Sequence, residues 1–210
     1  MPASAPTQIS KYTVGYNSFT SDVHTFCFAE GLYLSESGHD MPCLASLPVE
    51  QRFHRVVWGA FGMAEGTSPA ELLVGGADSG MISMHDAAKL IKGDANVLVF
   101  SKDKHTGAGA ALDFNPFQSD LLASGGSEYE LYTWNMNKLD TPMTPGVKSQ
   151  PLDNVRCVAW NRQEQHILAS TFSSTCVVWH LRKNDPIIEV SYSTSCMRCK
   201  VVSWHPDVAT

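Results

Sequence analysis

The residues with the clearest chemical potential are Cys196 and Cys199, which have the C-x-x-C spacing of a metal-ligand pair. His205 follows six residues after Cys199. A structural zinc site needs four such ligands, and a fourth, from Cys157 or His180, would have to be supplied by the fold. We therefore interpret the thiols as small side chains of strands and turns, and we predict no bound metal or cofactor.

Catalytic chemistry has little support elsewhere in the sequence. It contains no glycine-rich phosphate-binding loop, no G-x-S-x-G nucleophile turn and no H-E-x-x-H metal site. Asp185-Pro186 and His205-Pro206-Asp207 place an acid or a base beside proline, a pattern that local turns explain better than catalysis. We predict a protein that is not an enzyme. The alternative, an enzyme that uses the cysteine and histidine cluster, would lose activity with Cys199→Ser while keeping its fold.

Three segments of the sequence repeat one pattern, and a fourth copy begins near residue 200. Each copy has an aromatic residue at the same place in its first apolar run, at Trp58, Phe114, Trp160 and Trp204. These positions are separated by 56, 46 and 44 residues, and propeller repeats of the WD type are about 40–45 residues long. The longer first interval contains an insertion, GMAEGTSPAE.

Short apolar runs broken by small and polar residues make up each copy. LLVGG, LLASGG and ILAST are runs of small residues, whereas ELYTW and TCVVW contain the β-branched and aromatic residues that strands prefer. Only DAAKLIKG, at 86–93, has the pattern of a helical turn. We predict an all-β fold, a partial WD-repeat β-propeller with about three to four blades of about seven. A generic β-sandwich is the alternative.

The repeats divide the sequence into a divergent first part, residues 1–50 with a degenerate first blade, and a propeller part, residues 51–210. The units of the second part lie near 53–105, 106–154 and 155–199, and a truncated unit starts at 200. A partial propeller has open sheet edges with unpaired backbone groups. We therefore predict self-association through open blade edges, or completion of the propeller by another chain.

The second unit contains the four side chains of a structural hydrogen-bond relay. In a WD blade, a histidine before the innermost strand bonds to an acid in the turn between the second and third strands, and a small hydroxyl residue and a tryptophan complete the set. The candidates here are His105, Ser124, Glu128 and Trp134. The positions equivalent to Trp134 are His85 and Trp179, so the Trp-Asp pair that names the repeat is His-Asp, Trp-Asn and Trp-His in the three copies.

Composition and charge argue against several classes of protein. The chain has 210 residues, of which 43% are hydrophobic and 17% charged, as expected for a folded protein with a buried core. Its net charge of −6 argues against a nucleic-acid surface. Six cysteines without a secretory signal indicate a reduced cytosolic protein. No apolar run is long enough to span a membrane.

Several longer segments carry a family resemblance. They are FHRVVWGAFG with LLVGGADSGMI, NPFQSDLLASGGSE, TPMTPGVKSQP, AWNRQEQHILAS, LRKNDPIIEVS and WHPDVAT. Together they resemble the N-terminal propeller of the larger outer-coat subunit of COPII vesicles, the Sec31 type. The resemblance covers residues 51–210, whereas residues 1–50 match weakly. The sequence is divergent where the family has Trp-Asp.

This resemblance implies a non-enzymatic, protein-binding scaffold in vesicle transport from the endoplasmic reticulum to the Golgi. It implies a cytoplasmic protein, peripheral at endoplasmic reticulum exit sites and on COPII vesicles. The implied partners are other coat subunits, namely the Sec13-type WD protein and the inner-coat proteins. In that family a helical rod, a blade donated to the Sec13-type partner and a proline-rich region follow the propeller, and none lies within the matched residues. The alternatives are a WD-repeat adapter outside the coat and an inert truncated paralogue.

Overall fold

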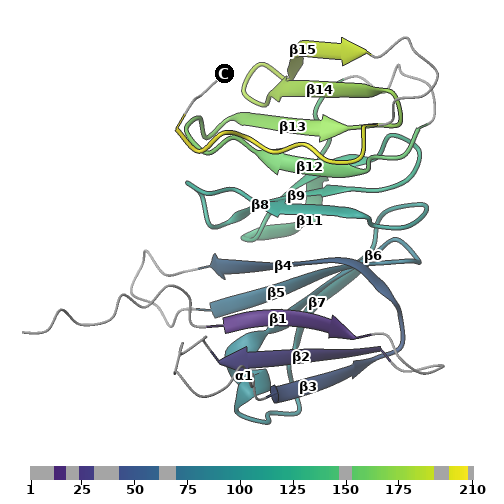
Figure 1. The fold of residues 1–210 in the computed structure, drawn as a ribbon. Coiled ribbons are helices and arrows are strands. Elements are labelled where there is room, and N and C mark those ends of the chain that lie inside the picture. The colour runs from purple at the N-terminus through teal and green to yellow at the C-terminus, as the bar shows by residue number, and fades with distance from the viewer. Residues whose placement is uncertain are drawn as a thin grey trace, which may run out of the picture. The chain divides into compact units, whose positions relative to one another are not determined.

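The computed structural model describes the chain in six stretches, drawn as coloured ribbon in Figure 1. They are residues 12–17, 24–30, 43–61, 70–146, 153–191 and 199–207. The chain divides into two compact units, the first formed by 1–52 with 88–96 and the second by 53–87 with 97–210. No helix within these stretches is long and apolar enough to cross a membrane.

The first unit contains a three-stranded antiparallel sheet, β1-β2-β3. Its strands are β1 (Tyr12–Asn17), β2 (His24–Glu30) and β3 (Cys43–Val49). Most of the single short helix among the described residues, α1 (Ala87–Ile91), also belongs to this unit. The helix ends where Gly93, at φ +74°, turns the chain and Asp94 N donates to Lys89 O. The helical turn predicted at 86–93 is therefore confirmed.

The second unit contains three four-stranded antiparallel sheets, and each follows the order of the chain. The first sheet has β4 (Phe53–Phe61), β5 (Ala70–Ala77), β6 (Met81–Asp86) and β7 (Leu98–Asp103). The second has β8 (Ala111–Phe114), β9 (Leu121–Gly125), β10 (Leu131–Asn135) and β11 (Lys138–Met143). The third has β12 (Cys157–Trp160), β13 (Ile167–Thr171), β14 (Thr175–His180) and β15 (Asp185–Ser191). The predicted all-β class is confirmed.

Strand register repeats from sheet to sheet. In the third strand of each sheet, the residue equivalent to Trp134 pairs with the leucine equivalent to Leu122 in the preceding strand. The pairs are His85 with Leu73, Trp134 with Leu122, and Trp179 with Leu168. Because a slip of one residue would move every side chain to the other face, this common register shows that the three sheets are copies of one unit.

The hydrophobic core of the second unit lies between neighbouring sheets. One cluster joins the first and second sheets and the other joins the second and third. The large buried residues in them include Met84, Trp134, Trp160, Phe172 and Trp179. Small residues allow this face-to-face packing: a Cβ on Gly125 would overlap the Val155 side chain, and one on Gly59 would overlap the Phe114 ring. Sheet-to-sheet burial is therefore the main stabilising contact of this unit.

Residues 199–207, the yellow trace in Figure 1, lie beside β12 without forming a described strand. Four hydrogen bonds hold them there, one of them from Cys157 Sγ to Val202 O (3.8 Å). Cys199 N donates to Ser173 O (3.1 Å), Trp204 Nε1 to Ala159 O (2.9 Å) and Gln163 Nε2 to Pro206 O (3.1 Å). The start of the predicted fourth copy thus packs against the third sheet.

Candidate binding surface along the inner strands

The buried relay of the second sheet connects three of the four residues that the sequence proposed. Trp134 Nε1 donates to Ser124 Oγ (2.7 Å), and Ser124 Oγ lies 2.9 Å from His105 Nε2. All three residues are buried. A Cβ on Gly126 would overlap the His105 ring, so the histidine needs a glycine opposite it. The loop before β8 is thereby attached to the middle strands of its sheet.

The acid beside His105 is Glu130 and not Glu128, which corrects the sequence assignment. Glu130 Oε2 lies 3.3 Å from His105 Nδ1 and accepts a hydrogen bond from Thr106 N (2.8 Å). Glu128 is exposed. The reason is the turn between β9 and β10: Glu128 (φ 55°) and Tyr129 (φ 63°) are its two central residues, and Glu130 N closes it by donating to Ser127 O. A side chain at the tip of such a turn points to solvent.

The His105 ring of the relay is uncharged at neutral pH. Burial, together with the charge of Lys104, lowers the pKa of His105 to about 4. A neutral ring with its proton on Nδ1 faces the Glu130 carboxylate and accepts the Ser124 hydroxyl proton on Nε2. That arrangement leaves Ser124 Oγ free to accept from Trp134. His105 Nδ1 lies 3.3 Å from Glu130 Oε2 without a hydrogen bond between them.

The other two sheets keep only part of the relay. In the third sheet Trp179 Nε1 donates to Ser170 Oγ (2.8 Å), and the loop residue Asp153 accepts from both Ser173 N and Ser173 Oγ (2.7 Å each). Burial would raise the pKa of Asp153, but these hydrogen bonds and the charge of Arg156 hold it below its ordinary value. In the third sheet the acid therefore lies in the loop, whereas in the second sheet it lies at the end of the turn between the second and third strands.

In the first sheet, His85 occupies the tryptophan position, and its burial lowers its pKa. Gly75 stands where the other sheets have serine. A contact between His54 Nε2 and the Asp78 carboxylate connects β4 to the turn after β5. In the first sheet a histidine at the start of the inner strand, His54, therefore makes the connection to the turn.

The first strands of the three sheets, which we call the inner strands (β4, β8 and β12), lie next to one another. Asp113, on β8, joins two of them: its carbonyl accepts from Trp160 Nε1 (3.0 Å) and its carboxylate accepts from Trp160 N (2.8 Å). Burial raises the pKa of Asp113, opposed by the Trp160 hydrogen bond and by Arg162. Arg162 Nη2 lies 3.3 Å from both carboxylate oxygens.

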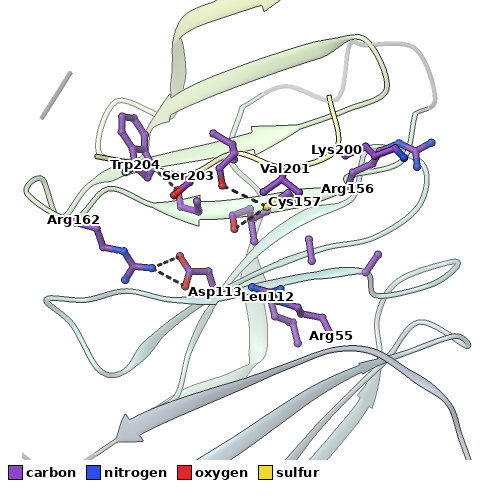
Figure 2. Close-up of a pocket in the computed structure, with 15 residues that line it drawn as sticks. Arg55, Leu112, Asp113, Arg156, Cys157, Arg162, Lys200, Val201, Ser203 and Trp204 are labelled. Atoms are coloured by element: carbon purple, nitrogen blue, oxygen red, sulfur yellow. Dashed lines mark hydrogen bonds and ion pairs between the residues drawn. The ribbon is translucent and has the colours of Figure 1, made fainter. Parts of the chain in front are cut away.

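A cavity of about 340 Å³ opens along these strands and residues 200–204 (Figure 2). Arg156 and Lys200 lie at one end of it, and Arg162 with Asp113 and Trp204 at the other. Arg55 completes the lining from β4. The walls carry four cationic side chains and one carboxylate, so the cavity is positively charged in a chain of net charge −6.

A second cavity, of about 570 Å³, shares Asp113 and Arg162 with the first. Its other walls are largely apolar and include Trp58, Phe114 and Phe117. Phe117 is 48% exposed. Trp58 and Phe114 are two of the repeat-equivalent aromatics, so the structure brings these residues to a surface cavity rather than to the interior alone.

The cysteine and histidine group does not form a metal site among the described residues. No group of three or more histidine, cysteine or acidic side chains suited to a metal occurs there. Cys196 lies outside the described residues. Cys157, Cys176 and Cys199 are free and half-buried, and burial raises the pKa of Cys176.

Sequence reasoning missed Glu130, Asp113 and the cations of the cavity. The repeat itself contained a signal for two of the cations, Arg156 and Lys200. They stand four residues before Trp160 and Trp204, where the first two copies have His54 and Ala110. Two of these four side chains are fully cationic and meet at one end of the cavity. No comparable spacing marks Asp113 or Glu130, whose partners come from other repeats or turns.

Comparison with known proteins gives close relatives. No family model matches the chain. The protein transport protein Sec31A of Gallus gallus is 48% identical over 180 residues, which cover 85% of this chain and 15% of the relative. Sec31A of Homo sapiens is 46% identical over the same coverage. The SEC31 protein of Mycosarcoma maydis is 32% identical over 194 residues, covering 81% of this chain and 14% of the relative.

Solved structures show the same relationship. A chain of the COPII outer coat vertex on membranes has a TM-score of 0.73 and 26% identity, covering 95% of this chain and 52% of that chain. A chain of the mitotic checkpoint complex has a TM-score of 0.66 at 17% identity, covering 88% of this chain and 52% of that chain, which shows the fold alone. The predicted partial WD-type propeller and the predicted resemblance are confirmed, and the chain is a homologue of the Sec31 protein transport proteins over about 15% of their length.

Proposed function

We propose that this chain is a non-enzymatic, protein-binding scaffold of the COPII outer coat, acting in protein transport. The observation that supports this most strongly is the near 50% identity to Sec31A over 85% of the chain, together with the likeness to a chain of the outer coat vertex. The described residues offer cavities and sheet faces but no group of side chains suited to a metal. Those surfaces suit contact with other proteins.

The finer parts of this proposal concern partners and location. The chain would join other coat components in the cytoplasm, including the Sec13-type WD protein and inner-coat proteins, at endoplasmic reticulum exit sites. Support comes from the relatives, which are protein transport proteins, and from the coat-on-membrane structures. The chain spans about 15% of those relatives, so each partner needs its own test.

The test is capture of the tagged chain from cytosol followed by mass spectrometry of what is bound. Recovery of COPII coat subunits is the expected result. A Trp160→Asp variant, in which a fully buried ring is replaced by a charge, controls for binding that any unfolded chain would show. Recovery of chaperones alone, by both proteins, would contradict the scaffold proposal.

Self-association through an open blade has support on the third sheet. One face of β14 and β15 carries Cys176, Val178, Ile188 and Val190 in paired register. Ile188 is 53% exposed and Val190 43% exposed, whereas Val177 and Trp179, on the opposite face, are buried in the core. Light scattering of Ile188→Lys is expected to show less dimer than the original chain. Glu189→Lys, on the same strand but the other face, is the matched control, and equal loss in both variants would contradict this contact.

A further inference from the structure

The two cavities along the inner strands are neighbours. Asp113 and Arg162 line both of them. Arg156 precedes β12 and Arg162 follows it, and a four-residue strand extends about 13 Å. The site is therefore elongated, with different chemistry at its two ends.

The first end is positively charged and available to a ligand. Arg55, Arg156 and Lys200 are all exposed, and none forms a salt bridge within the described part of the chain. Arg156 has one weak contact, from Nη2 to Ser173 Oγ at 3.4 Å. The fourth cation, Arg162, is already balanced by Asp113. Three cations without a salt bridge among the described residues thus face one cavity.

The second end is apolar and aromatic. Phe117 and Pro116 stand on the turn after β8, next to Trp58 and Phe114 of the inner strands. Asn115 holds this turn by accepting from Phe117 N (2.8 Å) and Gln118 N (2.9 Å). The Phe117 ring is therefore presented by an ordered turn, and an apolar side chain bound there would be removed from water.

These features select the chemical class of the ligand. A small inorganic anion would contact the cations but leave the aromatic end unused. A nucleic acid carries a phosphate at every nucleotide, whereas the second cavity has only one cation, Arg162, which Asp113 already balances. An extended peptide with acidic residues at one end and an apolar residue at the other matches both ends, because an extended chain has the length and the alternating side chains.

We propose that this site, formed by the inner strands and residues 199–207, binds an extended acidic segment of a partner protein through Arg55, Arg156 and Lys200, with an apolar side chain of that segment against Phe117. The inference rests on the proposed scaffold function for its biological meaning. Its physical test needs only the 210-residue chain and a peptide.

The experiment is a fluorescence anisotropy titration of the 210-residue chain with a fluorescein-labelled peptide that carries glutamates at one end and a leucine at the other. A peptide with glutamine in place of glutamate is expected to bind with about tenfold lower affinity. Added salt is expected to lower the affinity of the acidic peptide. The double variant Arg156→Glu with Lys200→Glu is expected to lose about tenfold or more in affinity. Phe117→Ala is expected to lower the affinity for the acidic peptide about threefold, because it removes the ring that the apolar side chain would contact.

The matched control is Lys138→Glu with Lys183→Glu, which makes the same change of charge at two exposed residues that do not line either cavity. Circular dichroism establishes that all variants are folded. Equal affinity in the two double variants would overturn the proposal. So would displacement of the peptide by inorganic phosphate at equal charge concentration, or tighter binding of a single-stranded oligonucleotide.

Failure here is distinguishable from failure of the scaffold proposal. If the chain captures coat subunits but does not bind the acidic peptide, the scaffold role stands and the peptide site is wrong. If the peptide binds and coat subunits are not captured, the site stands and the coat assignment is wrong.

Discussion

Trp204 lies against Ala159, and its indole N–H donates to the Ala159 carbonyl at 2.9 Å. Trp160 makes the same contact with Asp113, the equivalent residue of the preceding repeat, at 3.0 Å. The indole of one repeat is thus bonded to the inner strand of the repeat before it. This contact joins the third repeat to the second, and it recurs in residues 199–207 although no strand is described there.

Loss of this indole contact should destabilise the second unit. Trp204→Phe keeps an aromatic ring but removes the donor to Ala159, and we expect the free energy of unfolding to fall by about 1 kcal/mol. Urea denaturation measures it. Val201→Ala, at a side chain that is 76% exposed, is the control and is expected to change little. Equal stability of the two variants would show that residues 199–207 do not contribute through this bond.

The two buried serines should differ in their importance. Ser170→Ala leaves the Trp179 indole N–H without its acceptor, which costs about 1–3 kcal/mol for a buried donor. Ser124→Ala leaves both Trp134 Nε1 and His105 Nε2 without a partner. We therefore expect Ser124→Ala to be the more destabilising of the two in urea denaturation. The reverse order would mean that His105 does not depend on Ser124.

Replacement of the acids in the turn between β9 and β10 tests the corrected assignment. Glu130→Ala removes the acceptor of Thr106 N from a buried site, and we expect it to cost about 1–3 kcal/mol. Glu128→Asn should be neutral or stabilising by up to about 1 kcal/mol, because asparagine tolerates the positive φ of this position better. Thermal and urea unfolding measure both changes. A larger cost for Glu128→Asn would restore the original assignment.

Stability should decrease as the pH falls from about 6.5 to about 4. The pKa of His105 in the fold is about 4, below its ordinary value of 6.5, because of burial and the Lys104 charge. Since the unfolded chain takes up a proton at a higher pH than the folded chain, this contribution is fully present above pH 6.5. It is lost as the pH falls through the folded pKa, and amounts to about 3 kcal/mol.

Urea denaturation across this pH range checks that prediction. His85, whose pKa is also lowered by burial, contributes with the same sign. His105→Gln removes one titration and keeps a polar side chain, so we expect a shallower pH dependence than in the original chain. Parallel curves for the two proteins would show that His105 does not titrate differently on folding.

Much of the fold could be predicted because strand formation depends on residues that are close together in the sequence. The four-stranded repeat was predicted from runs such as LLASGG and ELYTW, and these correspond to β9 and β10. The equivalent positions His85, Trp134 and Trp179 were predicted from their spacing, and all three pair with an equivalent leucine. Strand propensity and period determine such features locally.

The candidate site could be predicted only in part. His105, Ser124 and Trp134 were identified, but the acid was placed at Glu128 because the sequence does not show where the turn reverses the chain. The two positive-φ residues decide that Glu130 and not Glu128 faces inward. The stretch with Cys196 remains a prediction of no metal that the described residues do not test.

The sequence by itself determined the repeat, the all-β class and the family resemblance, since each is carried by spacing and residue type within short segments. Only the tertiary structure decided that Arg55, Arg156 and Lys200 face one cavity, and that the cavity beside Phe117 shares Asp113 and Arg162 with it. The physical reason is that these side chains come from β4, from the loop before β12 and from residues 199–207. Their proximity depends on how whole sheets pack against one another, which no local pattern of residues specifies.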